Sequence, residues 1–345
     1  MKINKVILLF FVLILLEVGL RLSKKLKTYT EKNFSVYQSP YVPQSHNHIF
    51  SFNPNSETSS ETVEYEYFYT INRYGFVFNE KRVKNLNNAF VVLGDSFTFG
   101  AGAPEDSSMI SMLNSIIKRN KPNCEIAFLN AGMPGSDPFF QEKIMDSIFI
   151  PEGFKNFVYV FNISDLYDHI FRGGNERFIE NGKLSFSKPP WYHGLYRFSY
   201  ISRAIIHGVL KADYSLLPTK KLMLKKNIAV ERYLLLFKDI KEKVNEINGE
   251  LLVVTHPYPL NYDTTFTENW SVVNYTFVKD LTSLLKDEEI KVYDLELDFN
   301  KQLNPNNYLE YSWKVDGHFN SKGYNLFANL LYLNIENEIN DWCKD

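Results

Sequence analysis

The sequence predicts an α/β fold, a three-layer α/β/α sandwich in which helices cover both faces of a central parallel sheet. Three observations lead to this prediction. Several short runs from Phe90 onward are almost wholly apolar, which is typical of strands buried on both faces. Amphipathic helical segments alternate with these runs. The 345 residues, 45% of them hydrophobic, provide material for one large core.

The expected strands and helices follow one another in a regular order. The segment from Ser107 to Lys118 shows the helical pattern, because Met109, Leu113 and Ile116 fall on one helix face. We expect strands over residues 90–93, 126–129, 157–161, 251–255 and 290–293, and helices over 107–118, 141–148, 230–247, 272–285 and from 321 onward.

The chain divides into three regions. Residues 1–27 are expected to form a membrane anchor, residues 28–85 a lead-in, and residues 86–345 the main domain. In the lead-in, a polar and aromatic alternation from Glu64 to Tyr69 and a turn at 72–75 before Val77 and Phe78 predict a small hairpin packed on the main domain. The main domain carries an insertion at about 166–229, with a turn signal at 180–183. This insertion either shapes access to a site at the sheet edge or is a structural flap.

The N-terminus holds a long apolar run. Residues 6–16 are uncharged and are followed by Glu17 and Arg21. Such a run is too apolar for a soluble surface, so residues 6–22 are expected to enter a lipid bilayer. A spanning helix needs roughly 20 residues, which this one reaches if Arg21 and Lys24 extend to the interface. A single-pass anchor is the favoured interpretation, with a cleaved signal peptide or a buried N-terminal helix as alternatives.

Two features of the sequence point to opposite orientations of this anchor. Four basic residues between positions 21 and 27 outnumber Lys2 and Lys5, which by the positive-inside rule keeps the main domain in the cytoplasm. An apolar run at the extreme N-terminus instead resembles an uncleaved signal sequence, which directs the rest of the chain out of the cytoplasm. We expect an extracytoplasmic main domain.

Composition and charge exclude several classes of function. The formal net charge of -2, without a basic stripe, makes nucleic acid an unsuitable partner. Cys124 and Cys343 are too few for a disulfide framework and lack metal-ligand spacing, so they leave the redox compartment undecided. His46 and His48 lie in a polar loop without a nearby carboxylate set, so no metal is expected there.

A nucleophile, a base and an acid occur at places that suit an open α/β sheet. Ser96 follows the expected strand at 90–93, at the edge where such sheets carry out chemistry. His318, before the last long helix, is placed to take the serine proton, and Asp316 to fix the imidazole tautomer. Position 98 is Thr, so the Gly-x-Ser-x-Gly elbow is absent. Residues 94–102 lack phosphate-loop and dinucleotide spacing, so no cofactor is expected.

The order of these motifs resembles the four sequence blocks of the SGNH/GDSL hydrolase superfamily, over about residues 70 to 335. The resemblance is closest to membrane-tethered bacterial members, in which an apolar helix ends in a Glu and an Arg. It implies a flavodoxin-like parallel sheet and a serine hydrolase. The blocks are Gly94-Asp95-Ser96-Phe97, Asn130-Ala131-Gly132-Met133-Pro134-Gly135, Phe161-Asn162-Ile163-Ser164-Asp165 and Asp316-Gly317-His318.

The resemblance also implies an oxyanion hole, made by the backbone N–H groups of Ser96 and Gly135 and an Asn side chain. Ser164 stands at the Asn position and Asn162 lies two residues earlier. Either the serine hydroxyl replaces the amide, or Asn162 reaches in, or one donor is missing.

The acid of the family often lies three residues before the histidine, whereas Asp316 lies two before it. Asp294 and Asp298 are therefore kept as alternative acids. Asp95 and His256 are candidate substrate contacts, and His256 has a structural role as its alternative.

The predicted function is hydrolysis of an ester through an acyl-serine intermediate. By resemblance, the substrate is an O-acylated carbohydrate or another envelope ester. One alternative is an O-acyltransferase that uses the same three residues on a polysaccharide. Another is a non-catalytic scaffold or binding protein, which the serine at position 164 and the shifted acid make credible.

Overall fold

Five parallel strands form the central sheet, in the order β4-β3-β5-β6-β7. This computed structural model describes residues 5–23, 51–78, 85–178, 188, 190–210, 217–256, 268–303, 307–314 and 316–344. Leu93 of β3 pairs with Ala131 of β4 and with Tyr159 of β5, so β4 and β5 flank β3. The strand order therefore reverses between β3 and β5, which places a topological switch point there. The strands are β3 (Ala89–Gly94), β4 (Ala127–Gly132), β5 (Asn156–Phe161), β6 (Leu251–Thr255) and β7 (Lys291–Asp294).

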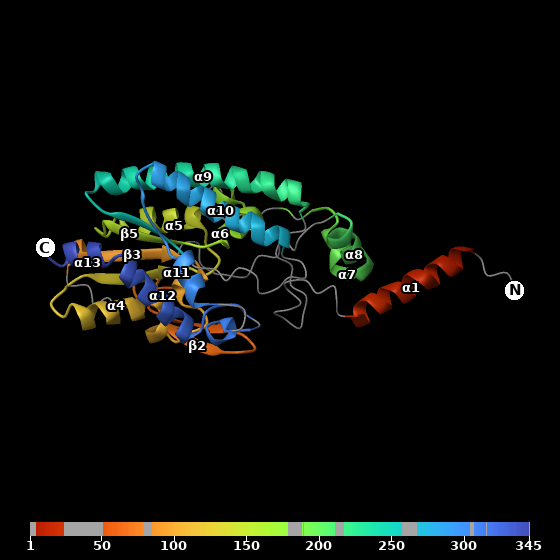
Figure 1. Cartoon of the computed structure of the whole chain (residues 1–345), viewed down its shortest axis with the longest axis horizontal. Helices are drawn as coiled ribbons and strands as arrows, with labels where there is room; N and C mark the ends of the chain where they lie inside the picture. The colour runs from red at the N-terminus through yellow and green to blue at the C-terminus, as the bar shows by residue number, and fades with distance from the viewer. Residues whose placement is uncertain are drawn as a thin grey trace.

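Helices cover both faces of the sheet (Figure 1). Alternation along β3 explains this, because Val91 and Leu93 enter one core while Phe90 and Val92 enter the other. On the first face lie α5 (Pro138–Ile144), α6 (Asp165–Arg172), α9 (Thr219–Glu246) and α10 (Glu268–Asp287). On the second lie α4 (Met109–Asn120), α11 (Glu296–Gln302), α12 (Ser321–Asn334) and α13 (Glu336–Trp342).

The predicted three-layer sandwich is confirmed, with every expected strand present within three residues of its bounds. The expected helix at 230–247 begins earlier, at Thr219, so residues 219–229, the last part of the expected insertion, belong to α9. The expected helix at 141–148 is divided between α5 and a π-helical turn, η4 (Met145–Phe149). Short 3-10 turns are η2 (Leu86–Asn88), η3 (Glu105–Ser107), η5 (Gly174–Arg177) and η7 (Tyr308–Glu310).

The lead-in contains a hairpin with a different partner strand from the one expected. β1 (Glu57–Glu61) pairs antiparallel with β2 (Glu66–Thr70). The expectation that Val77 and Phe78 supply the second strand is wrong, because Asn72 closes a turn there by accepting hydrogen bonds from the backbone N–H groups of Tyr74 and Phe76. The hairpin packs on the main domain through a small buried cluster of Tyr69, Ile71, Val77, Phe99 and Ala101.

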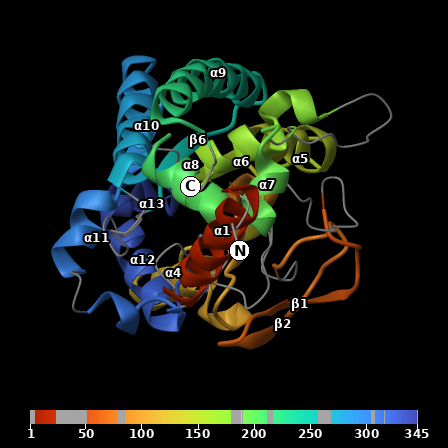
Figure 2. The same cartoon turned by 90° about the vertical axis from the view of Figure 1, so that its right-hand side faces the viewer.

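The insertion and the N-terminal helix lie at one end of the molecule. α1 (Lys5–Ser23) projects from the body beside α7 (His193–Phe198) and α8 (Tyr200–Gly208), as both views show (Figures 1 and 2). None of its residues is buried, so the alternative of a buried N-terminal helix is wrong. By length and composition α1 is able to cross a membrane. The turn expected at 180–183 lies outside the described residues.

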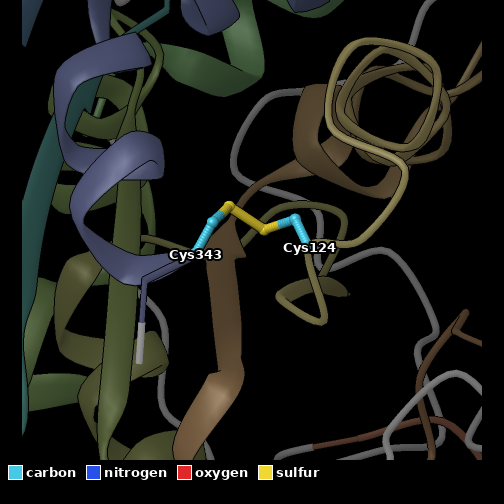
Figure 3. The surroundings of a disulfide bond; sticks show 2 residues. All are labelled: Cys124 and Cys343. Carbon is cyan, nitrogen blue, oxygen red and sulfur yellow. A yellow bond between two sulfur atoms is a disulfide. The ribbon is translucent and has the colours of Figure 1, made fainter.

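A disulfide joins Cys124, just before β4, to Cys343, just after α13 (Figure 3). No local pattern in the sequence indicated this pairing, because the two residues are 219 positions apart. Their meeting follows from the packing of Trp342 on Phe90 and Phe128, near the beginning of β3 and β4.

Candidate active site

The predicted nucleophile lies where β3 ends. Asp95 caps the short helix α3 (Ser96–Phe99) by accepting a hydrogen bond of 2.9 Å from the backbone N–H of Phe97. Ser96 is therefore the first residue of α3, at the carboxyl end of β3 and next to the switch point between β3 and β5. It is partly exposed, whereas Asp95 is buried. This is the sheet edge at which open α/β sheets bind ligands.

The structure brings Ser96, His318 and Asp316 together across the length of the chain. The Oγ atom of Ser96 lies 2.8 Å from Nε2 of His318, and Nδ1 of His318 is hydrogen-bonded to the carboxylate of Asp316. Burial opposes ionisation of Asp316, but the hydrogen bonds from His318 and Tyr65 hold the pKa of its carboxyl below the ordinary value. Hydrogen bonds thus link a nucleophile, a base and an orienting acid in that order.

The alternative acids are engaged elsewhere. Asp294 accepts a hydrogen bond of 2.8 Å from the hydroxyl of Thr255, and Asp298 pairs with Lys301 at 2.7 Å. Among the described residues, His318 is bonded to neither of them. The geometry therefore favours Asp316, despite its spacing of two residues from the histidine.

The lead-in hairpin holds this acid, a contact that the sequence did not predict. The Glu64 carboxylate accepts hydrogen bonds from the backbone N–H groups of Lys314, at 3.0 Å, and of Asp316, at 2.9 Å. The hydroxyl of Tyr65 donates to the Asp316 carboxylate at 2.9 Å, and its ring packs on Trp313. Burial and the neighbouring Asp316 raise the pKa of Tyr65, so this phenol keeps the proton that it donates. Glu64 and Tyr65 are thus positioning residues for Asp316.

The loop after β4 lies against the end of β3. The carbonyl oxygen of Gly94 accepts from the backbone N–H of Met133 at 2.8 Å and from the hydroxyl of Ser136 at 3.1 Å. Gly135 has a φ of +69°, which a residue with a side chain rarely adopts. Among the described residues, the N–H groups of Ser96 and Gly135 have no hydrogen-bond acceptor. Both of the predicted backbone donors are therefore available for a ligand.

The close approach of this loop to α3 requires a glycine at position 132. A Cβ atom there would lie 2.1 Å from the backbone nitrogen of Phe99, far inside contact distance. Asn130 reinforces the approach, because its amide donates to the carbonyl of Phe99 and accepts from the N–H of Gly132. The Asn-Ala-Gly run thus fixes the distance between α3 and the end of β4.

The third predicted oxyanion donor is the weakest part of the site. The hydroxyl of Ser164 donates to Oδ2 of Asp95 at 2.8 Å, so its proton is already engaged. Asn162 is fully buried and accepts from the N–H of Ser164, while its amide nitrogen has no hydrogen-bond partner in the described part of the chain. The engaged Ser164 hydroxyl disfavours the alternative in which it replaces the amide, and the choice between Asn162 and a missing donor stays a prediction.

The two candidate substrate contacts, Asp95 and His256, are both buried. Burial raises the pKa of Asp95 to about 6, against the hydrogen bonds from Ser164 and Phe97, which lower it. His256 is only 4% exposed and lies among the rings of Phe97, Phe319 and Phe327. This placement favours the structural role for His256, and substrate contact by either residue stays a prediction.

The expectation that no metal binds at His46 and His48 concerns residues that the structure does not describe. In the described ranges, no group of three or more His, Cys, Asp or Glu side chains is arranged to hold a metal ion.

No protein-family model and no curated protein matches the chain. Solved structures do resemble it. An acetyl xylan esterase matches at 12% identity with a TM-score of 0.44, over 71% of this chain and 98% of that one. A lipase/acylhydrolase from Enterococcus faecalis matches at 16% identity with a TM-score of 0.43, over 72% and 96%.

An acetylxylan esterase from Geobacillus stearothermophilus, solved as a catalytic mutant, matches at 10% identity with a TM-score of 0.43, over 72% of this chain and 93% of that one. At these identities the likeness concerns the fold. The motifs of the chain resemble those of SGNH/GDSL hydrolases. Esterases and a lipase are among the solved structures to which the chain is similar.

Proposed function

We propose that the protein is a serine hydrolase that cleaves ester bonds. One observation carries the proposal: Oγ of Ser96 lies 2.8 Å from Nε2 of His318, whose other ring nitrogen is bonded to Asp316. A serine hydroxyl is a poor nucleophile unless a neighbouring base takes its proton, and this arrangement supplies that base in the required orientation.

In the proposed reaction, His318 takes the hydroxyl proton as Ser96 attacks the ester carbonyl. Asp316 keeps the proton of His318 on Nδ1 and stabilises the imidazolium that forms. The N–H groups of Ser96 and Gly135 donate hydrogen bonds to the carbonyl oxygen and so stabilise the negative charge that develops on it. His318 then gives its proton to the leaving alcohol, and water attacks the acyl-serine in a second round of the same steps.

We propose an O-acylated carbohydrate or another envelope ester as the substrate, handled outside the cytoplasm by a membrane-anchored enzyme. The disulfide between Cys124 and Cys343 supports this location, because such bonds persist in oxidising compartments and are rare in the cytosol. The apolar helix α1 supports the anchor. Transfer of the acyl group to a carbohydrate instead of water would use the same acyl-serine.

The test compares the full chain with its Ser96→Ala variant in detergent. We expect p-nitrophenyl acetate hydrolysis to fall by at least about 10³-fold in the variant and labelling by a fluorophosphonate probe to disappear. The control is Ser115→Ala, which removes an exposed hydroxyl on α4 and should leave both signals unchanged.

Two further results would redirect the assignment. Slow hydrolysis that a carbohydrate acceptor accelerates, with the acetyl group recovered on the acceptor, would identify an acyltransferase. A folded wild-type chain that neither turns over nor labels would refute the enzyme and favour the non-catalytic alternative.

A further inference from the structure

We propose that the α7–α8 pair sits in the membrane surface beside α1, with the lipid bilayer as the occupant of its exposed apolar face. The proposal rests on α1 being the membrane anchor proposed above. It concerns a second, independent element, because α7 and α8 belong to the insertion after β5 and lie far from α1 in the sequence.

The anchor helix α1 docks on the start of α8. Both oxygens of Glu17 are used there: Oε1 accepts from the N–H of Tyr200 at 2.9 Å, and Oε2 accepts from the N–H of Ile201 and the hydroxyl of Ser199, both at 3.0 Å. Glu17 thus satisfies N–H groups that the first turn of a helix leaves without partners. Arg21 adds a hydrogen bond to the carbonyl of Phe198 at 2.6 Å.

The length of α1 sets the depth of this contact. The uncharged part from Val6 to Leu16 rises only about 16 Å, roughly half of a hydrocarbon core of about 30 Å. The whole helix from Lys5 to Ser23 has 19 residues and rises about 28 Å. If α1 crosses the bilayer, its last turns and Glu17 must therefore enter the membrane or its headgroup region. The residues that bind Glu17 must then lie at the same depth.

Large apolar side chains of α7, α8 and the residues that flank them are exposed, while polar and charged side chains are buried. In water, a helix normally turns its apolar face to the core and its polar face outward. Here, large apolar side chains point outward: Phe198 is 73% exposed and Val209 is 72% exposed. The buried face holds polar and charged groups beside Tyr196 and Ile206. The exposed set is Trp191, Leu195, Phe198, Ile205, Val209 and Leu210, and the buried polar set is His193, Arg203 and His207.

Two buried polar groups of this pair, Arg203 and His207, have partners inside it, as a lipid environment demands. Tyr196 and His207 are hydrogen-bonded at 2.9 Å, and Arg203 donates to the carbonyls of Tyr196 and Arg197. Residues 190–210 include no Asp or Glu. The surface therefore suits the interface of a bilayer, where aromatic and basic side chains are favoured.

A membrane position for α7 and α8 would also orient the proposed active site. Cys343 and α13 lie near the beginnings of β3 and β4, at the opposite end of the molecule from α1, so the carboxyl ends of the strands point toward the end that holds α1, α7 and α8 (Figure 1). The sheet edge that carries Ser96 is thus turned toward the bilayer.

The test measures depth in the full chain, reconstituted in phosphatidylcholine and phosphatidylglycerol vesicles. Both native cysteines are in the disulfide, so a single introduced cysteine takes a nitrobenzoxadiazole label. Labels are placed at Ile205→Cys and Val209→Cys, with Leu13→Cys in α1 as the positive control. The matched negative control is Leu333→Cys, an equally apolar residue of α12 that is 64% exposed. The quenchers are lipids brominated near the headgroup or deep in the acyl chain.

We expect the labels at Ile205 and Val209 to lose most of their fluorescence with shallow bromines, the label at Leu13 with deep ones, and the label at Leu333 with neither. Labels on α8 that behave like Leu333 while Leu13 is quenched would overturn the inference and leave the anchor intact. Fluorescence of the α8 labels that changes with protein concentration but not with brominated lipid would overturn the inference. It would indicate that a second copy of the chain covers this face. Absence of quenching at Leu13 as well would refute the proposal that α1 is a membrane anchor.

Discussion

Asp95 carries the most direct test of the electrostatics beside Ser96. Burial raises the pKa of this carboxyl from an ordinary value of 3.8 to about 6. The folded state therefore holds the Asp95 proton more tightly than the unfolded state does. Above pH 6 the native protein contains an ionised buried carboxylate, and below about pH 4 both states are protonated. Asp95 thus destabilises the fold at neutral pH, and this penalty disappears as the pH falls from 6 to 4.

The size of the penalty can be worked out from the same values. A shift of about two units corresponds to about 3 kcal/mol in the free energy of unfolding, at 1.36 kcal/mol per unit. Asp95→Asn removes the charge but keeps the helix cap, because its side-chain oxygen still accepts from the N–H of Phe97. Its amide nitrogen takes the place of the second oxygen and donates to the hydroxyl oxygen of Ser164 instead of accepting from it. We expect the variant to be more stable than the wild type by up to about 3 kcal/mol at pH 8 and nearly equal to it at pH 4.

The assay is urea unfolding of the full chain in detergent, followed by tryptophan fluorescence between pH 4 and pH 8. The difference between wild type and variant reports the charge of Asp95 together with its repulsion of the nearby Asp165, whose pKa is raised by burial and by Asp95. Asp106→Asn, at an exposed carboxylate, should show no such pH-dependent difference. A wild-type-to-Asn difference at position 95 that stays constant with pH would refute the reasoning.

Three further predictions concern the acid, the third donor and the disulfide. Tyr65→Phe removes one hydrogen bond to the Asp316 carboxylate, so kcat/KM should fall about 10-fold and the pH–rate profile should move, whereas Tyr67→Phe in the same hairpin should change neither. Ser164→Ala should reduce kcat by far less than the 10²-fold or more that follows loss of an oxyanion donor, because its proton goes to Asp95; a full loss would place Ser164 in the oxyanion hole. A reductant should lower the free energy of unfolding by about 2 to 5 kcal/mol by opening the bond between Cys124 and Cys343, and a variant with Ser at both positions should not respond to it.

Local patterns were enough to predict the strands and three side chains that the structure joins by hydrogen bonds, those of Ser96, His318 and Asp316. The run from Leu251 to Thr255 is a strand at those same bounds. A short run that is almost wholly apolar is typical of a strand buried on both faces of a sheet. Ser96 and His318 could be paired because the sequence predicts the strand that ends just before Ser96 and the helix that begins just after His318. What failed depended on distant contacts: the hydrogen bond from Tyr65 to Asp316 joins residues 251 positions apart, and that from Ser164 to Asp95 joins residues 69 apart. The apolar surface of α7 and α8 was also missed, because the amphipathic rule assumes that the apolar face points inward.

The lead-in hairpin gives a physical reason for the unusual spacing between acid and histidine. An acid two residues before its histidine must reach back toward Nδ1 within a short loop. Within residues 316–318, as the structure describes them, the only support for the carboxylate besides the bond to Nδ1 itself is a long hydrogen bond of 3.4 Å from the N–H of His318. Glu64 accepts from the N–H of Asp316 and of Lys314, and Tyr65 binds the Asp316 carboxylate itself, so the hairpin sets both the backbone and the side chain of the acid. Hydrogen bonds to ionised groups are worth about 1.5–3 kcal/mol each, enough to select one loop conformation. A region that precedes the sheet in the sequence therefore positions the acid of the proposed catalytic triad, and activity should depend on Glu64 and Tyr65 as well as on the loop that carries His318.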